Sequence, residues 1–112
     1  MTNGFSPIRR FQRFSVNLSV VCVSGERTIA DEIVNLSLGG ACVKTHTPLK
    51  PGSKHHFVIT VPDHKLRASA VDVEAVVAWS SSDEHRMGLQ FEQHSDGIDD
   101  YLRRLERVSN SL

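Results

Sequence analysis

Residues 71–79 read Val-Asp-Val-Glu-Ala-Val-Val-Ala-Trp, and this stretch decides the fold class. Its apolar residues stand at positions 71, 73, 75, 77 and 79, and acidic residues stand between them at 72 and 74. Alternation with a period of two is typical of a β-strand that buries one face and exposes the other. On this pattern Trp79 is expected to pack in the core beside Val73 and Val77.

Shorter stretches with the same alternation occur on both sides of this strand. Their apolar side chains stand at 16, 18, 20 and 22, at 57, 59 and 61, and at 87, 89 and 91. Two further strands are expected at about 28–36, with Ala30, Val34 and Leu36 on one side, and at 41–45 after Gly39-Gly40. Six short strands with turn residues between them predict a mainly all-β chain, folded as a six-stranded antiparallel β-barrel.

The end of the chain has a different period. From Ser95 onward the apolar residues recur every three or four positions, at 98, 102, 105 and 108, which is the spacing of one helix face. Ser95 or Asp96 is suited to cap this helix, and acidic residues early and arginines late match the helix dipole. We expect a C-terminal α-helix over residues 95–109 that packs on the barrel, with docking of a partner as the alternative.

Size and composition fit one soluble domain. The chain has 112 residues, 39% of them apolar, and a formal net charge of zero, so net charge gives no general attraction to nucleic acid or membranes. Residues 1–8 show no periodicity and are expected to form a flexible tail, with residues 9–112 forming the barrel domain and its helix. No membrane-spanning run or signal-peptide pattern is seen, so we expect a cytoplasmic protein.

Residue types that bind metals or carry catalysis are scattered along the chain. The six histidines and two cysteines show no spacing of a zinc site and no C-x-x-C pair. The serines lack the sequence context of a hydrolase nucleophile. We therefore expect no metal, no cofactor, reduced thiols and no enzymatic activity.

Three arginines lie close together near the N-terminus, at Arg9, Arg10 and Arg13. A guanidinium donates two hydrogen bonds to guanine O6 and N7, stacks on bases, and makes charge-assisted bonds to phosphate oxygens. Lysine supplies the charge without the planar fork. The cluster therefore fits a small anionic ligand that carries guanine, although taken alone it also fits a solvated basic tail.

A polar segment follows about twenty residues later, and residues 35–40 read Asn-Leu-Ser-Leu-Gly-Gly. In an extended chain Asn35 and Ser37 face one side while the leucines turn inward. The Asn35 amide oxygen is suited to accept from the guanine N1 or N2 edge, and Ser37 to bond a phosphate or base. Gly40 fits a sharp turn or a place where a side chain would block the ligand. The alternative is a turn whose polar side chains bond local backbone groups.

Together these segments resemble the two motifs of the PilZ domain family of bacterial cyclic di-GMP receptors, R-x-x-x-R and [D/N]-x-S-x-x-G. Residues 76–79 and 87–91 also look like the late strands of that family. The resemblance implies a stand-alone six-stranded barrel with a C-terminal helix, and an arginine-bearing N-terminus that folds over the nucleotide. Many members have Asp where this chain has Asn35, and an amide accepts fewer hydrogen bonds than a carboxylate.

The function expected from this resemblance is a cyclic di-GMP receptor that signals to an unidentified partner protein. The ligand-binding residues expected are Arg9, Arg10, Arg13, Asn35, Ser37, Gly40 and, because an indole at a strand end is suited to stack on a base, Trp79. One alternative is a small barrel that binds single-stranded nucleic acid with Phe11 or Phe14 as a stacking surface, and the zero net charge argues against it. The other is a PilZ-like protein-interaction module that binds no nucleotide.

Overall fold

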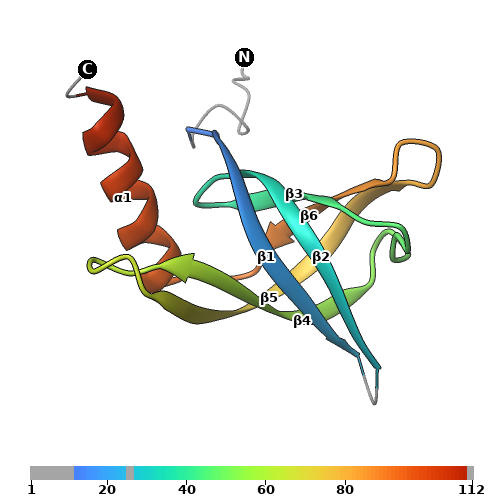
Figure 1. Cartoon of the computed structure of the whole chain (residues 1–112). Helices are drawn as coiled ribbons and strands as arrows, with labels where there is room; N and C mark the ends of the chain where they lie inside the picture. Colours follow the sequence, from blue (N-terminus) through green and yellow to red (C-terminus); the bar gives the residue numbers. More distant parts are fainter. Residues whose placement is uncertain (1–11, 25–26, 111–112) are drawn as a thin grey trace.

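The computed structural model describes residues 12–24 and 27–110. Within these ranges the strands are β1 (Phe14–Ser24), β2 (Arg27–Leu36), β3 (Gly40–Lys44), β4 (Lys54–Pro62), β5 (Ala68–Ser81) and β6 (Arg86–Phe91), and the helix is α1 (Asp96–Asn110). The strands pair antiparallel and close into a barrel in the order β1-β2-β3-β6-β5-β4 (Figure 1). The predicted fold class, a six-stranded antiparallel barrel with a C-terminal helix, is confirmed.

The core fills the interior of the barrel with alternate residues of each strand. Leu18, Val20 and Cys22 of β1 are buried, as are Phe57 and Ile59 of β4. Burying one such large apolar side chain stabilises the fold by roughly 1.5–3 kcal/mol. The alternation in the sequence therefore located these strands and their inner faces correctly.

Two irregularities in strand pairing correct the expected faces. The register of β2 against β3 shifts between Ile33 and Asn35, so Ile33 and Leu36 are fully buried while Ala30 is exposed. The register of β5 against β6 shifts between Val77 and Trp79. An extra residue in one strand turns the following side chain to the other face. Trp79 is therefore 45% exposed, and the prediction that it packs in the core is wrong.

The same shift in β2 corrects the expectation for Val34. This residue was expected on the same face as Leu36, but it is only partly buried and does not belong to the core cluster. Regular alternation places residues 34 and 36 on one face, and the shift removes that relationship. The core side of β2 is therefore set by Ile33 and Leu36.

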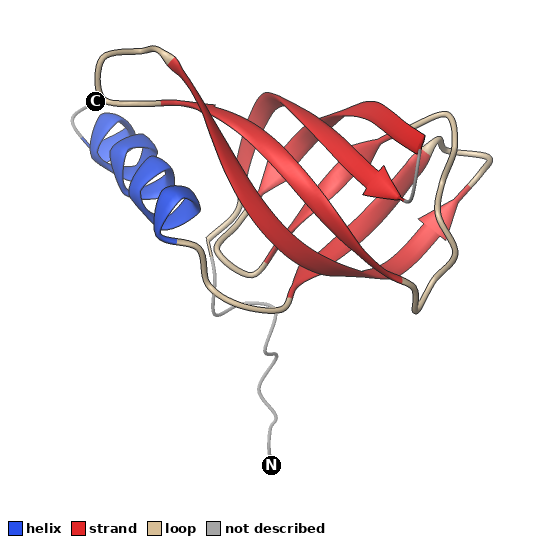
Figure 2. Cartoon of the chain, turned by 90° about the horizontal axis from the view of Figure 1, so that it is seen from below, coloured by secondary structure: helices blue, strands red, loops and turns tan. Residues whose placement is uncertain are grey.

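The helix α1 is anchored to the barrel by its first half. The Ser95 hydroxyl accepts a hydrogen bond from the Ile98 N–H at 3.4 Å, which confirms Ser95 as the cap. Ile98 and Leu102 are buried in the core cluster, and the Arg104 guanidinium donates to the Pro62 carbonyl at 2.8 Å. Figures 1 and 2 both show α1 beside the loop that joins β4 and β5. The expected packing helix is thus present.

Candidate functional site

The residues singled out in the sequence come from segments that the barrel brings side by side. Arg13 directly precedes β1, Asn35 lies near the end of β2, and Trp79 lies near the end of β5. Ser37 and Gly40 lie in and after the turn that joins β2 to β3. Arg9, Arg10 and the expected tail over residues 1–8 lie outside the described residues.

Strand register aligns four of the barrel's residues in one row, here called the outer row: Asn35, Cys42, Gly88 and Trp79. Asn35 pairs with Cys42 across β2 and β3, Cys42 with Gly88 across β3 and β6, and Gly88 with Trp79 across β6 and β5. Paired residues of antiparallel strands point to the same face. Because Ala41 and Val43 on either side of Cys42 are buried, the row faces outward. The structure thus brings Asn35 and Trp79 onto one surface.

Ser37 does not share the outward orientation expected for it. Strand β2 ends at Leu36, so the alternation stops and Ser37 is only 9% exposed. Its hydroxyl accepts hydrogen bonds from the N–H groups of Gly39 and Gly40, both at 3.2 Å. Its own N–H donates to the Gly40 carbonyl at 2.9 Å. Ser37 therefore holds the β2–β3 turn, and a direct bond from Ser37 to a ligand stays a prediction.

Two glycines are required by close approaches, Gly40 near the outer row and Gly88 within it. A Cβ atom at Gly40 would overlap the carbonyl oxygen of Leu89 on β6, so this glycine lets β3 approach β6 where the barrel closes. A Cβ atom at Gly88 would overlap the indole of Trp79. The fold therefore requires glycine at position 40 independently of any ligand.

Two guanidinium groups act on Cys42, which lies within the outer row. Burial raises the pKa of the Cys42 thiol, while the guanidinium groups of Arg86 and Arg13 act in the opposite direction and the Glu84 carboxylate adds a smaller increase. Two arginines from different parts of the chain thus act on one thiol. Arg13 belongs to the first motif, whereas Arg86 belongs to neither motif and sequence reasoning missed it. Alternation places Arg86 on the same face as Gly88, but its effect on Cys42 depends on how β6 pairs with β3.

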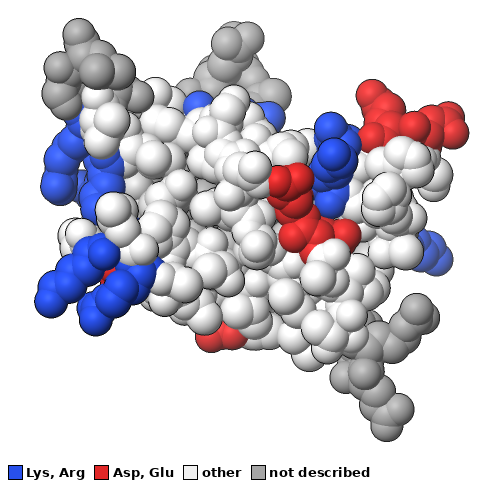
Figure 3. All heavy atoms as spheres, in the orientation of Figure 1, with Lys and Arg blue, Asp and Glu red and all other residues white. Residues whose placement is uncertain are grey.

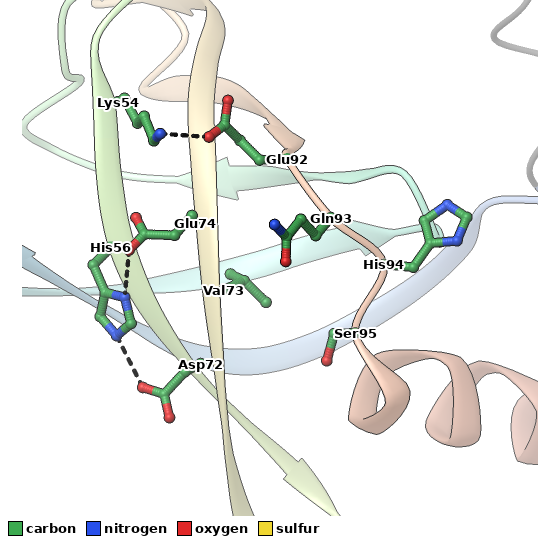
Figure 4. A pocket seen from close by; sticks show the side chains of 9 residues that line it. All are labelled: Lys54, His56, Asp72, Val73, Glu74, Glu92, Gln93, His94 and Ser95. Carbon is green, nitrogen blue, oxygen red and sulfur yellow. Dashed lines mark hydrogen bonds and ion pairs between the residues drawn. The ribbon is translucent and has the colours of Figure 1, made fainter.

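A second group of polar residues lines a shallow pocket of about 360 Å³ on β4, β5 and the segment before α1 (Figure 4). His56 bonds Asp72 at 2.9 Å and Glu74 at 3.2 Å, and Lys54 pairs with Glu92 at 2.6 Å. The bonds to Asp72 and Glu74 raise the pKa of His56. These charged groups are paired with one another, and none of the motif residues lines the pocket.

Two other kinds of feature are absent from the described residues. Among residues 12–24 and 27–110, no group of His, Cys, Asp and Glu side chains is arranged to hold a metal ion. No helix in the part of the chain that the structure describes is long and apolar enough to cross a membrane.

The architecture is that of a closed six-stranded antiparallel barrel followed by one helix. The family model described as "PilZ domain" matches residues 7–108. This match spans nearly the whole chain, and the chain therefore belongs to the PilZ domain family. A sequence comparison with curated proteins gave no match.

Solved structures that share the fold include the following three. The inhibitor of motility MotI/DgrA of Bacillus subtilis matches with a TM-score of 0.70 and 21% identity, over 91% of this chain and 52% of that one. The PilZ domain of CeSA from a cellulose-synthesizing bacterium matches with a TM-score of 0.58 and 20% identity, over 84% of this chain and 93% of that one. The PilZ domain of YcgR from Escherichia coli, solved with c-di-GMP, matches with a TM-score of 0.59 and 17% identity, over 93% of this chain and 98% of that one. This chain spans about half the length of the MotI/DgrA chain.

Proposed function

We propose that this protein is a receptor for cyclic di-GMP and not an enzyme, and that the ligand binds over the outer row. The observation that carries the proposal is that strand pairing places Asn35 and Trp79 in one outward-facing row. The Arg13 guanidinium acts electrostatically on Cys42, which lies between them in that row. Membership of the PilZ family supports the same ligand class. A related PilZ domain, that of YcgR, was solved with c-di-GMP.

The spacing of the row suits a nucleotide. Neighbouring strands lie about 4.8 Å apart, so the three strand spacings from β2 to β5 give about 14 Å. In the proposed complex Asn35 accepts from the edge of a guanine and the Trp79 indole stacks on a base. Arg13, with Arg9 and Arg10, supplies bidentate contacts to guanine and charge-assisted bonds to the phosphodiesters.

We extend the proposal to the output of the receptor. The arginine segment is proposed to change conformation as it closes over the nucleotide, and a partner protein is proposed to read the altered surface. One contact supports coupling of the site to α1: the Phe91 N–H donates to the Gly39 carbonyl in the β2–β3 turn at 2.9 Å. Phe91 ends β6, and the segment after it leads directly into α1.

Calorimetric titration of the purified chain tests the proposal, with cyclic di-GMP, GMP and single-stranded DNA as parallel ligands. Trp79 is the one tryptophan of the chain, so its fluorescence gives a second readout beside the site. Saturable binding of cyclic di-GMP with little response to the other two ligands is expected. Preferred binding of DNA would favour the nucleic-acid barrel. If the folded protein binds none of the three ligands, the remaining alternative is a PilZ-like protein-interaction module.

A further inference from the structure

Arg86 faces the outer surface of the barrel next to the outer row. It is the first residue of β6, two positions before Gly88, and its register partner on β3 is Lys44. Residues two apart on a strand point to the same face, and register partners point together. Arg86 and Lys44 therefore project on the side of the barrel that carries Cys42.

Two like charges directly opposite one another on neighbouring strands destabilise a sheet. Carboxylates flank this pair, since Glu32 faces Lys44 from β2 and Asp83 and Glu84 lie in the turn before β6. Figure 3 shows Lys or Arg atoms between two groups of acidic atoms over β2 and the β5–β6 turn. Within the described ranges, however, neither Lys44 nor Arg86 forms an ion pair. Such a pair is relieved by an anion that binds between or beside the two cations.

The Arg86 guanidinium is held in place from one side. Its Nη1 donates to the backbone carbonyls of Glu84 at 3.3 Å and His85 at 3.2 Å. An arginine has five N–H donors in a rigid fork, and among residues 12–24 and 27–110 no acceptor is seen for the donors of Nε and Nη2. A side chain that is already positioned loses less freedom when it binds a ligand.

The positive charge of Arg86 acts on the outer row. Arg86 and Arg13 both influence the Cys42 thiol, and their combined effect there exceeds that of Glu84. Cys42 is the register partner of Asn35 on one side and of Gly88 on the other. Arg86 at the start of β6 and Arg13 just before β1 thus both act on the residue at the middle of the outer row.

We infer that Arg86 is a further ligand-binding residue of this site, which donates hydrogen bonds to a phosphodiester oxygen of the bound nucleotide. The inference rests on the proposed function and adds a contact that neither sequence motif contains. Lys44 contributes positive charge beside it.

Calorimetric titration of cyclic di-GMP into wild type, Arg86→Gln and Arg103→Gln tests this inference at low and moderate salt. Arg103 is a matched control, because it is an exposed arginine on α1 that pairs with Asp99. Loss of a charge-assisted bond is expected to weaken binding by Arg86→Gln about ten- to a hundredfold and to flatten its salt dependence. Arg103→Gln is expected to bind as wild type does.

The unfolding midpoint without ligand separates a binding role from a structural one. Arg86→Gln is expected to stay folded with close to wild-type stability, because removal of a like-charge pair offsets the loss of two exposed hydrogen bonds to the Glu84 and His85 carbonyls. If this variant does not fold, Arg86→Lys decides the question: a several-fold loss of affinity supports the inference, and wild-type affinity overturns it. Unchanged affinity in folded Arg86→Gln overturns the inference while the proposed function stands. A wild-type protein that binds no cyclic di-GMP contradicts both.

Discussion

The indole of Trp79 lies across the backbone of Gly88, its register partner on β6. A Cβ atom at position 88 would overlap the Nε1, Cε2 and Cδ1 atoms of the indole. The absence of a side chain at Gly88 therefore lets a half-exposed aromatic ring rest against the outside of the barrel. This contact fixes one end of the outer row, and Asn35 marks the other end.

Replacing Arg13 with alanine is expected to weaken cyclic di-GMP binding by roughly 1–3 kcal/mol, the cost of a lost bidentate guanine contact. The melting temperature without ligand is expected to stay unchanged, because Arg13 is exposed and precedes β1. Arg9→Ala is expected to behave in the same way. Calorimetry and thermal unfolding measure the two effects, with Arg103→Ala as the control. An Arg13→Ala protein that is unfolded without ligand would show that the arginine is structural.

Asn35 and Ser37 are expected to separate binding from stability. Asn35→Ala is expected to lose affinity with little change in the free energy of unfolding, because Asn35 faces outward. Ser37→Ala is expected to lose about 1–3 kcal/mol of that free energy, because the N–H groups of Gly39 and Gly40 lose their hydroxyl acceptor. Urea unfolding beside calorimetry checks both variants. The reverse pattern would contradict the geometry assigned to the turn.

His56 is expected to make stability depend on pH. Its bonds to Asp72 and then Glu74 raise its folded pKa above the unfolded value of about 6.5. The stabilisation is therefore fully present below that unfolded value and is lost as the pH rises through the raised folded pKa. The free energy of unfolding in urea is expected to be higher for wild type than for His56→Gln, and the difference is expected to be largest at mildly acidic pH. A difference that grows toward alkaline pH would show that the sign is wrong.

Hydrogen exchange tests the proposed movement of the arginine segment. Adding cyclic di-GMP is expected to raise protection around residues 9–14 and 35–40, because the ligand contacts both. Residues 71–78 are expected to change little, since the core already holds β5. Equal protection of residues 9–14 in both states would remove the switch mechanism and leave binding intact.

The sequence predicted the strands because a barrel with one buried face imposes a period of two. It did not predict which side Trp79 or Ile33 occupies, because each follows or precedes a register shift that depends on the partner strand. The buried position of Ser37 depends on where β2 ends, and alternation does not encode that end. Arg86 lies outside both motifs, and the pairing of β3 with β6 brings its strand beside Cys42. Local pattern thus located the elements, and long-range pairing set the surface.

An amide NMR titration with cyclic di-GMP reports binding and its location on the barrel in one experiment. The N–H signals of Gly40, Cys42 and Gly88 and the indole N–H of Trp79 are expected to shift and saturate. Signals of Ile59 and Val61, buried in β4, are expected to stay in place. Folded protein whose spectrum is unchanged at high micromolar nucleotide would contradict the proposed binding over the outer row, and so would shifts confined to the pocket around His56 and Glu92.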